Sequence, residues 1–176
     1  VARGATGLTA GAGGPAAAIN LVRKRASSKE CTGSAEVGIG SWNERRAMID
    51  VSTPVNEAKT LRARVVADYA DGDSAADLLS NKRQTLFATF EADLTPNTLL
   101  SGGFSRQEND PKGSMWGGLP VWYSDGTRTD WSRSKTTSAD WVSWNSVYEN
   151  YFATLEHRFD NDWKVKASYN YGDREA

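Results

Sequence analysis

The feature that most constrains the fold of this chain is a two-residue alternation of apolar and polar side chains. It is clearest in Leu61–Ala70, Leu86–Leu94 and Tyr151–Phe159. This period is typical of a β-strand with one apolar and one polar face. The pattern predicts an all-β, antiparallel fold of seven strands, the other four being Glu36–Trp42, Arg46–Ser52, Thr98–Arg106 and Val165–Tyr171. No convincing helix is predicted, because the one candidate, Ser74–Leu79, is too short to stand alone.

The connections between the predicted strands differ in length on the two sides of the sheet. Thr95–Asn97 and Asp160–Asp162 are brief and rich in turn formers, whereas Gly72–Arg83 and Gln107–Ser146 are long. Short turns at one rim and long loops at the other are typical of outer-membrane β-barrels, and strands of about ten residues match a tilted membrane crossing. Aromatic residues also collect at strand ends, as in an interfacial girdle: Trp42, Tyr69, Phe159, Trp163 and Tyr171.

A soluble antiparallel sandwich or barrel alternates in the same way, so the pattern alone leaves both folds open. Two details favour the membrane. The polar face is charged in nearly every strand, which a water-filled lumen tolerates, and the apolar face mixes Ala, Leu, Val and aromatic residues, which suits lipid.

The composition of the chain excludes several classes of protein. Among 176 residues, 21 Lys+Arg are balanced by 22 Asp+Glu, so the broad basic surface of a nucleic-acid-binding protein is absent. The longest uncharged run, Gly4–Val22, carries five glycines and a proline and does not suit a membrane-spanning helix. A single cysteine, Cys31, excludes an internal disulfide framework. The chain opens on Val1 without a signal peptide, and seven strands leave two unpaired edges, so we expect a piece of a larger protein.

A tryptophan-rich stretch is the strongest candidate for a binding site. Five of the seven Trp lie within Asp110–Ser146, a connection too long to be only structural in a compact domain. Exposed Trp rings offer flat, rigid apolar surface with one N–H donor, which suits stacking on a ligand. Because Lys and Arg in this stretch are offset by Asp, a nearly neutral ligand is favoured over a strongly anionic one.

Catalytic and metal sites are poorly supported. The only histidine, His157, falls on the apolar face near a short turn, where an interfacial role fits better than that of a general base. Converging metal ligands and a Gly-x-Ser-x-Gly elbow are absent. The three consecutive cations Arg23–Arg25 lack interleaved aromatic residues, and we interpret them as a solvated or headgroup-facing cluster. We therefore expect no enzyme, no catalytic residue and no metal site.

Several strings of residues resemble a known family, the TonB-dependent outer-membrane siderophore receptors. Strings similar to the end of that family's plug domain are Arg3–Leu8, Gly11–Gly13, Pro15 and Ala18–Arg25. Strings similar to its first barrel hairpin are Gly40–Trp42, Asp50–Ser52 and Pro54. One branch of the family takes up ferric hydroxamate and pyoverdine-type siderophores. Strings similar to a long extracellular loop of that branch are Asn109–Ser114, Trp116–Pro120 and Tyr123–Arg128. Leu155–Asp160 resembles a recurrent strand-to-periplasmic-turn string.

The resemblance implies a large closed barrel in the cell outer membrane with a globular plug in its lumen. Residues 1–30 then form the C-terminal end of the plug, and residues 31–176 the N-terminal third of the barrel, with a long extracellular loop at 107–146. It also implies import of a ferric siderophore, driven by the TonB complex through a segment outside this chain, in contact with outer-membrane lipid. Iron is carried by the siderophore, so no cofactor is expected.

By the same resemblance, four aromatic residues are the candidates for siderophore contact: Trp116, Trp122, Tyr123 and Trp144. Arg3 is expected near the plug–lumen interface, and Cys31 lies in the linker between plug and barrel without an assigned role. The runner-up function is a secreted or surface β-sheet module that binds carbohydrate or another ligand through the Trp-rich loop.

Overall fold

The computed structural model describes residues 2–3, 17–18 and 22–176, with side chains from Val22 onward. A two-residue strand β1 (Ala2–Arg3) pairs antiparallel with β2 (Ala17–Ala18). All other strands belong to a single seven-stranded antiparallel sheet. The described residues contain no helix able to cross a membrane.

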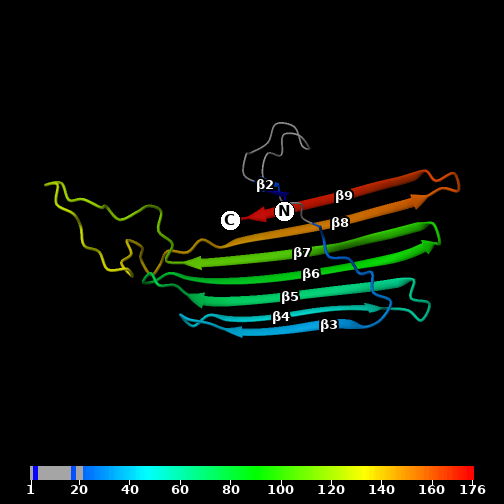
Figure 1. The fold of residues 1–176 in the computed structure, drawn as a ribbon, viewed down its shortest axis with the longest axis horizontal. Helices are drawn as coiled ribbons and strands as arrows, with labels where there is room; N and C mark the ends of the chain where they lie inside the picture. Colours follow the sequence, from blue (N-terminus) through cyan, green and yellow to red (C-terminus); the bar gives the residue numbers. More distant parts are fainter. Residues whose placement is uncertain (1, 4–16, 19–21) are drawn as a thin grey trace.

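The seven-stranded sheet is a simple meander, in which each strand pairs with the next one along the chain (Figure 1). Its strands are β3 (Thr32–Ile39), β4 (Arg45–Pro54), β5 (Leu61–Asp73), β6 (Ser80–Thr95), β7 (Thr98–Lys112), β8 (Ser146–Arg158) and β9 (Lys164–Glu175). The seven strands and the all-β antiparallel fold predicted from the alternation are thereby confirmed. Ser74–Leu79, the one helical candidate, is a turn between β5 and β6.

The middle strands are longer than the alternation indicates. The pairs Lys82↔Asp110 and Gln84↔Glu108 continue the ladder between β6 and β7 well beyond the apolar stretch. The connection expected at Gly72–Arg83 therefore shrinks to residues 74–79, and the loop expected at 107–146 spans residues 113–145. Ladder hydrogen bonds require no apolar side chain, so pairing persists where both faces of the sheet are polar and the alternation in hydropathy disappears.

The first strand also ends earlier than expected. It was predicted to reach Trp42, but β3 stops at Ile39, and Trp42 and Asn43 adopt positive φ angles of 54° and 59° in a tight turn. Gly40 N–H donates to the Glu44 carbonyl at 2.9 Å and closes this turn. Trp42 nevertheless lies at the rim of the sheet, as the prediction of an aromatic girdle requires.

The two faces of the sheet differ sharply in chemistry. The inner face, which residues 22–26 cross, carries the buried polar side chains: Asp50, Ser52, Arg62, Thr89, Glu91 and Asn150. On the outer face the large apolar side chains are exposed, including Val65 (45%), Leu86 (41%) and Tyr169 (65%). Only Ala26 and Val66 are buried apolar residues in the described part of the chain, so the sheet encloses no apolar core. An apolar face without a covering layer is what lipid contact requires and what a soluble sandwich lacks.

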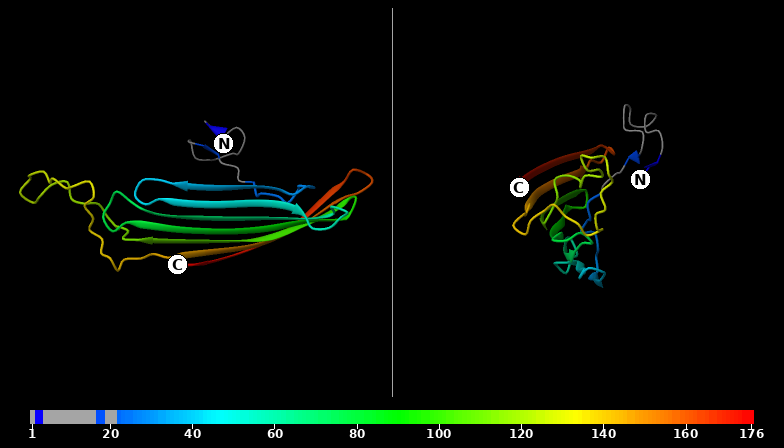
Figure 2. Two further views of the ribbon diagram at one scale, coloured as in Figure 1. Left: turned by 90° about the horizontal axis from the view of Figure 1, so that it is seen from below. Right: turned by 90° about the vertical axis from the view of Figure 1, so that its left-hand side faces the viewer.

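The sheet is twisted and curved, and the connection between β7 and β8 projects well beyond its end (Figure 2). That rim also carries the turns 40–44 and 74–79, whereas the opposite rim carries residues 55–60, 96–97 and 159–163. The predicted asymmetry between the two rims is present, but it is concentrated in residues 113–145.

Candidate ligand-binding site

The base of the long loop is closed by backbone pairing and by one glycine. Gly113 N–H donates to the Val142 carbonyl at 2.8 Å, and Trp144 N–H donates to the Pro111 carbonyl at 3.1 Å. Gly113 has a φ of 66°, and a Cβ built on it would lie 2.1 Å from the Leu78 carbonyl oxygen. Only glycine fits such a position, because it has no Cβ to clash. The loop therefore leaves the sheet in close contact with the neighbouring turn 74–79.

A stacked pair of indoles joins the two ends of the loop. The rings of Trp116 and Trp144 lie 4.6 Å apart at an interplanar angle of 18°. Trp116 remains 80% exposed and Trp144 46% exposed. One face of each ring is thus used within the protein, and both side chains still reach solvent. The pair offers a ligand a pre-ordered apolar surface with little side-chain entropy left to lose.

The middle of the loop is a small hairpin. Tyr123 N–H donates to the Thr127 carbonyl at 2.8 Å, and Thr129 N–H donates to the Val121 carbonyl at 2.9 Å. At its tip, the Asp125 carboxylate accepts hydrogen bonds from the Thr127 hydroxyl (2.6 Å) and backbone N–H (2.9 Å). These bonds favour the ionised form and lower the pKa of Asp125 from its ordinary value, the hydroxyl contributing most.

Trp131 holds this hairpin in place and was not among the residues selected from the sequence. Its indole N–H donates to the Pro120 carbonyl at 2.8 Å, and its ring lies 6.4 Å from that of Tyr123. Trp122 lies in the same hairpin, opposite Arg128, and is 61% exposed. Nothing in the spacing of the tryptophans distinguishes Trp131, because its partner is a backbone carbonyl.

The four predicted contact residues therefore fall into two groups. Trp116 stacks on Trp144 at the base of the loop, and Trp122 and Tyr123 share the hairpin. In the residues that the structure describes, no aromatic pair joins one group to the other. Their role in siderophore binding remains a prediction. For Arg3, the structure describes only the backbone pairing with Ala17, and its side chain lies outside the described part.

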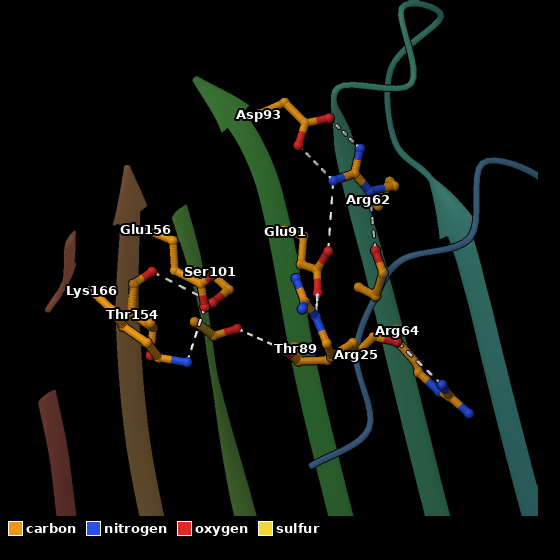
Figure 3. A network of polar contacts seen from close by, with 12 residues as sticks. Arg25, Arg62, Arg64, Thr89, Glu91, Asp93, Ser101, Thr154, Glu156 and Lys166 are labelled. Atoms are coloured by element: carbon orange, nitrogen blue, oxygen red, sulfur yellow. Dashed lines mark hydrogen bonds and ion pairs between the residues drawn. The ribbon is translucent and has the colours of Figure 1, made fainter. Parts of the chain in front are cut away.

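The inner wall below the loop is polar and hollowed. A cavity of about 900 Å³ is lined by Val22–Arg25 and by inward-facing residues of β5–β9, mostly hydroxyls, amides and ions, with Phe87 and Phe152. Figure 3 shows two groups of contacts on this wall: one around Arg62, Glu91 and Asp93, the other joining Glu156 to Lys166, whose charged atoms lie 3.0 Å apart.

The cations Arg23–Arg25, interpreted from sequence as a solvated or headgroup-facing cluster, are exposed. They lie on the inner wall, and each pairs with a residue far along the chain. We call residues 23–26 the strap, because Figure 1 shows this stretch running across the sheet from the β8–β9 side towards the start of β3. The overlooked signal was the set of charges on the polar face of the strands.

His157 lies near the end of β8, beside the turn 159–163. Its Nδ1 lies 2.8 Å from the Thr98 hydroxyl, and its ring meets Phe159 edge-on at 4.4 Å. Within the described residues, no group of three His, Cys, Asp or Glu is arranged to hold a metal ion.

Comparison with known proteins decides the family. The chain is 43% identical over 172 residues to the ferripyoverdine receptor of Pseudomonas aeruginosa and 35% identical over 173 residues to the ferric-pyoverdine 358 receptor of Pseudomonas putida. The chain belongs to the TonB-dependent siderophore receptors. These matches cover 97% and 98% of the chain but 21% of each relative, so this receptor chain spans about a fifth of their length. No protein-family model matches it.

A solved relative extends the comparison to the fold. The crystal structure of the outer-membrane ferripyoverdine receptor of Pseudomonas aeruginosa, bound to ferripyoverdine, matches with a TM-score of 0.85. The match covers 96% of this receptor chain and 22% of the relative, at 43% identity. The seven strands are thus a portion of an antiparallel outer-membrane barrel, as the sequence predicted, and the relatives are receptors rather than enzymes.

Proposed function

We propose that this chain forms the plug end and first barrel strands of a receptor that imports a ferric siderophore of the pyoverdine class. The observation that carries the proposal is the agreement with the ferripyoverdine receptor along 97% of the chain, together with a sheet that is polar inside and apolar outside. Residues 1–30 are assigned to the plug and residues 31–176 to the barrel. This division agrees with the start of the seven-stranded sheet at Thr32.

The proposed partners follow from the two faces and the loop. The apolar outer face contacts outer-membrane lipid, and the inner wall surrounds the plug. A TonB energy-transducing complex acts through a segment outside this chain. The protein needs no cofactor and performs no catalysis, because the siderophore holds the iron that is its cargo. The runner-up, a secreted carbohydrate-binding module, is not supported by relatives that are all receptors.

The geometry suggests how the loop acts. Trp116 and Trp144 present a two-ring surface at the base of the loop, and Trp122 and Tyr123 present a second surface on the hairpin. A bulky, nearly neutral chelate offers both surfaces apolar area and hydrogen-bond acceptors for the indole N–H groups. The polar inner wall then receives the chelate below the loop, where it remains solvated by hydroxyls and amides.

The test is the affinity of the full-length receptor for ferripyoverdine after single substitutions. Trp116→Ala and Trp144→Ala are each expected to weaken binding by about tenfold or more, since truncating a central aromatic anchor costs at least about 1.4 kcal/mol. Trp163→Ala is the matched control, because Trp163 is exposed in the turn after β8, at the opposite rim of the sheet. Equal affinities for all three variants and the unsubstituted receptor would remove the Trp116–Trp144 pair from the binding site.

A further inference from the structure

The strap is attached to the inner wall at every one of its four residues. Arg23 donates to Asn150 at 3.1 Å and to Asn170 at 2.6 Å. Lys24 pairs with Asp50 at 2.6 Å, and Arg25 pairs with Glu91 at the same distance. Ala26 is fully buried, and its carbonyl accepts a hydrogen bond from Arg62 at 3.2 Å. Four consecutive residues thus contact strands β4, β5, β6, β8 and β9.

Arg62 is the centre of this attachment (Figure 3). It is 4% exposed, and besides Ala26 it donates to both carboxylate oxygens of Asp93 and to the Lys59 carbonyl. Its guanidinium also lies 3.6 Å from Glu91, which is 3% exposed and pairs with Arg25 on the other side. The guanidinium and the carboxylates therefore satisfy one another, and a buried charge is stable only when it is paired in this way.

The Arg23 end of the strap rests on an aromatic platform. Its guanidinium carbon lies 4.1 Å above the ring centroid of Phe152, and Phe87 stacks beside Phe152 at 6.1 Å. Gly103 leaves room for this arrangement, because a Cβ there would lie 2.8 Å from Phe152 Cζ and 2.2 Å from the Ala88 carbonyl oxygen. A cation over an aromatic face and two side-chain amide acceptors fix Arg23 in direction as well as in position.

The residues after the strap are attached far less. Lys29, Glu30 and Cys31 are exposed, and the side-chain hydrogen bond in this stretch is a local one from Ser28 to the Glu30 carbonyl at 2.7 Å. The strap, which is the attached part of this stretch, therefore lies inside the segment assigned to the plug and before the first barrel strand, which begins at Thr32.

We propose that the strap is a static anchor, which keeps residues 23–26 on the inner wall throughout the import cycle. This inference rests on the proposed function, since a plug that fills a lumen must rearrange to let a chelate pass. The rearrangement then involves residues before Val22, and the strap marks where it stops, because it is held by a cation–π contact and by ion pairs to the buried carboxylates of Asp50 and Glu91. Release of the strap would remove Arg25 from Glu91 and the Ala26 carbonyl from Arg62, so the buried Glu91 would keep Arg62 as its one cation partner.

The test uses the full-length receptor with Val22→Cys and Ser105→Cys in a Cys31→Ser background. Val22 and Ser105 line the same inner cavity, and neither belongs to the contacts that hold the strap. Reducible bis-methanethiosulfonate linkers of increasing length join the two cysteines, and uptake of iron-loaded pyoverdine is measured before and after reduction. Uptake by the linked receptor within about twofold of the reduced receptor is expected. A loss of tenfold or more that reduction reverses would overturn the static anchor.

Nitroxide labels on the same two cysteines provide a measurement that does not depend on uptake. We expect one narrow distance distribution, unchanged by ferripyoverdine and by the periplasmic domain of TonB. A second, longer distance in their presence would refute the anchor. Absence of uptake by the reduced receptor with an unchanged distance distribution would instead count against the proposed function, so failures of the two proposals are distinguishable.

Discussion

Replacement of Arg62 by alanine is expected to destabilise the inner wall on which the strap rests. The substitution removes four hydrogen bonds, to Ala26, Lys59 and the two carboxylate oxygens of Asp93, and leaves Glu91 buried with a single cation. Breaking a buried ion pair by removing one partner costs about 3–5 kcal/mol. The Asp93 side chain is 38% exposed, so water can hydrate its carboxylate once Arg62 is removed. Losing the ion pair between Arg62 and Asp93 should therefore cost about 0–1 kcal/mol, as is typical of a surface pair. We therefore expect a loss of about 3 kcal/mol, near the lower end of the buried range.

The quantity to measure is the free energy of unfolding of the full-length receptor. The unfolded fraction is measured as urea is increased, and linear extrapolation gives the value in water. Arg62→Lys tests the geometry, because it keeps the charge but loses the planar fork that holds Asp93, and it should lie between the alanine variant and the unsubstituted protein.

Arg158→Ala is the matched control. Arg158 pairs with Asp162 in the turn after β8, where the two side chains are 60% and 80% exposed, so its loss should cost at most about 1 kcal/mol. If Arg62→Ala and Arg158→Ala lowered the free energy of unfolding by the same amount, the burial argument for Arg62 would be wrong.

Two further predictions concern a glycine and a carboxylate. Gly103→Ala is expected to lower the receptor's melting temperature, because the new Cβ overpacks the Phe152 platform at a cost of about 1–3 kcal/mol. Gly117→Ala should leave the melting temperature unchanged, because nothing lies within 4 Å of its new Cβ. Thr127→Ala should raise the pKa of Asp125 towards its ordinary value in a carbon-13 NMR titration. Because that pKa is lowered in the folded hairpin, the stabilisation is present at neutral pH and is lost as the pH falls through it. An unmoved titration midpoint would contradict this assignment.

The strands and their faces were predictable because lipid and a water-filled lumen impose opposite requirements on alternate residues. Leu61, Val65 and Tyr69 fall on the exposed apolar face of β5, and Arg62 and Arg64 on the inner face, in the register that the alternation indicates. Strand ends were less predictable. Above the apolar band both faces of β6 and β7 meet water, so pairing continues without a signal in hydropathy.

The contacts that organise the site were beyond sequence reasoning for a different reason. The partners of Arg23–Arg25 were not predicted because Asp50, Glu91 and Asn150 lie 26, 66 and 127 residues further along the chain. The Trp-rich loop was identified from composition. Which Trp holds the hairpin and which Trp lies at the base of the loop depends on the Pro120 carbonyl and on loop closure at Gly113, and only the folded backbone reveals these contacts.

The strap also has a consequence for how the wall acquires its shape. Its contacts reach from Asp50 on β4 to Asn170 on β9, so a short stretch near the start of the chain bridges strands that are made much later. The contact between Arg23 and Asn170 joins residues that lie 147 positions apart in the sequence. Closing so long a loop costs conformational entropy, so the pairing of the strands between them must bring the two residues close together before this contact forms. Because all these partners lie on one face, the strap ties together strands that the meander alone does not pair, and it limits how far β4 and β9 can separate on that side of the sheet.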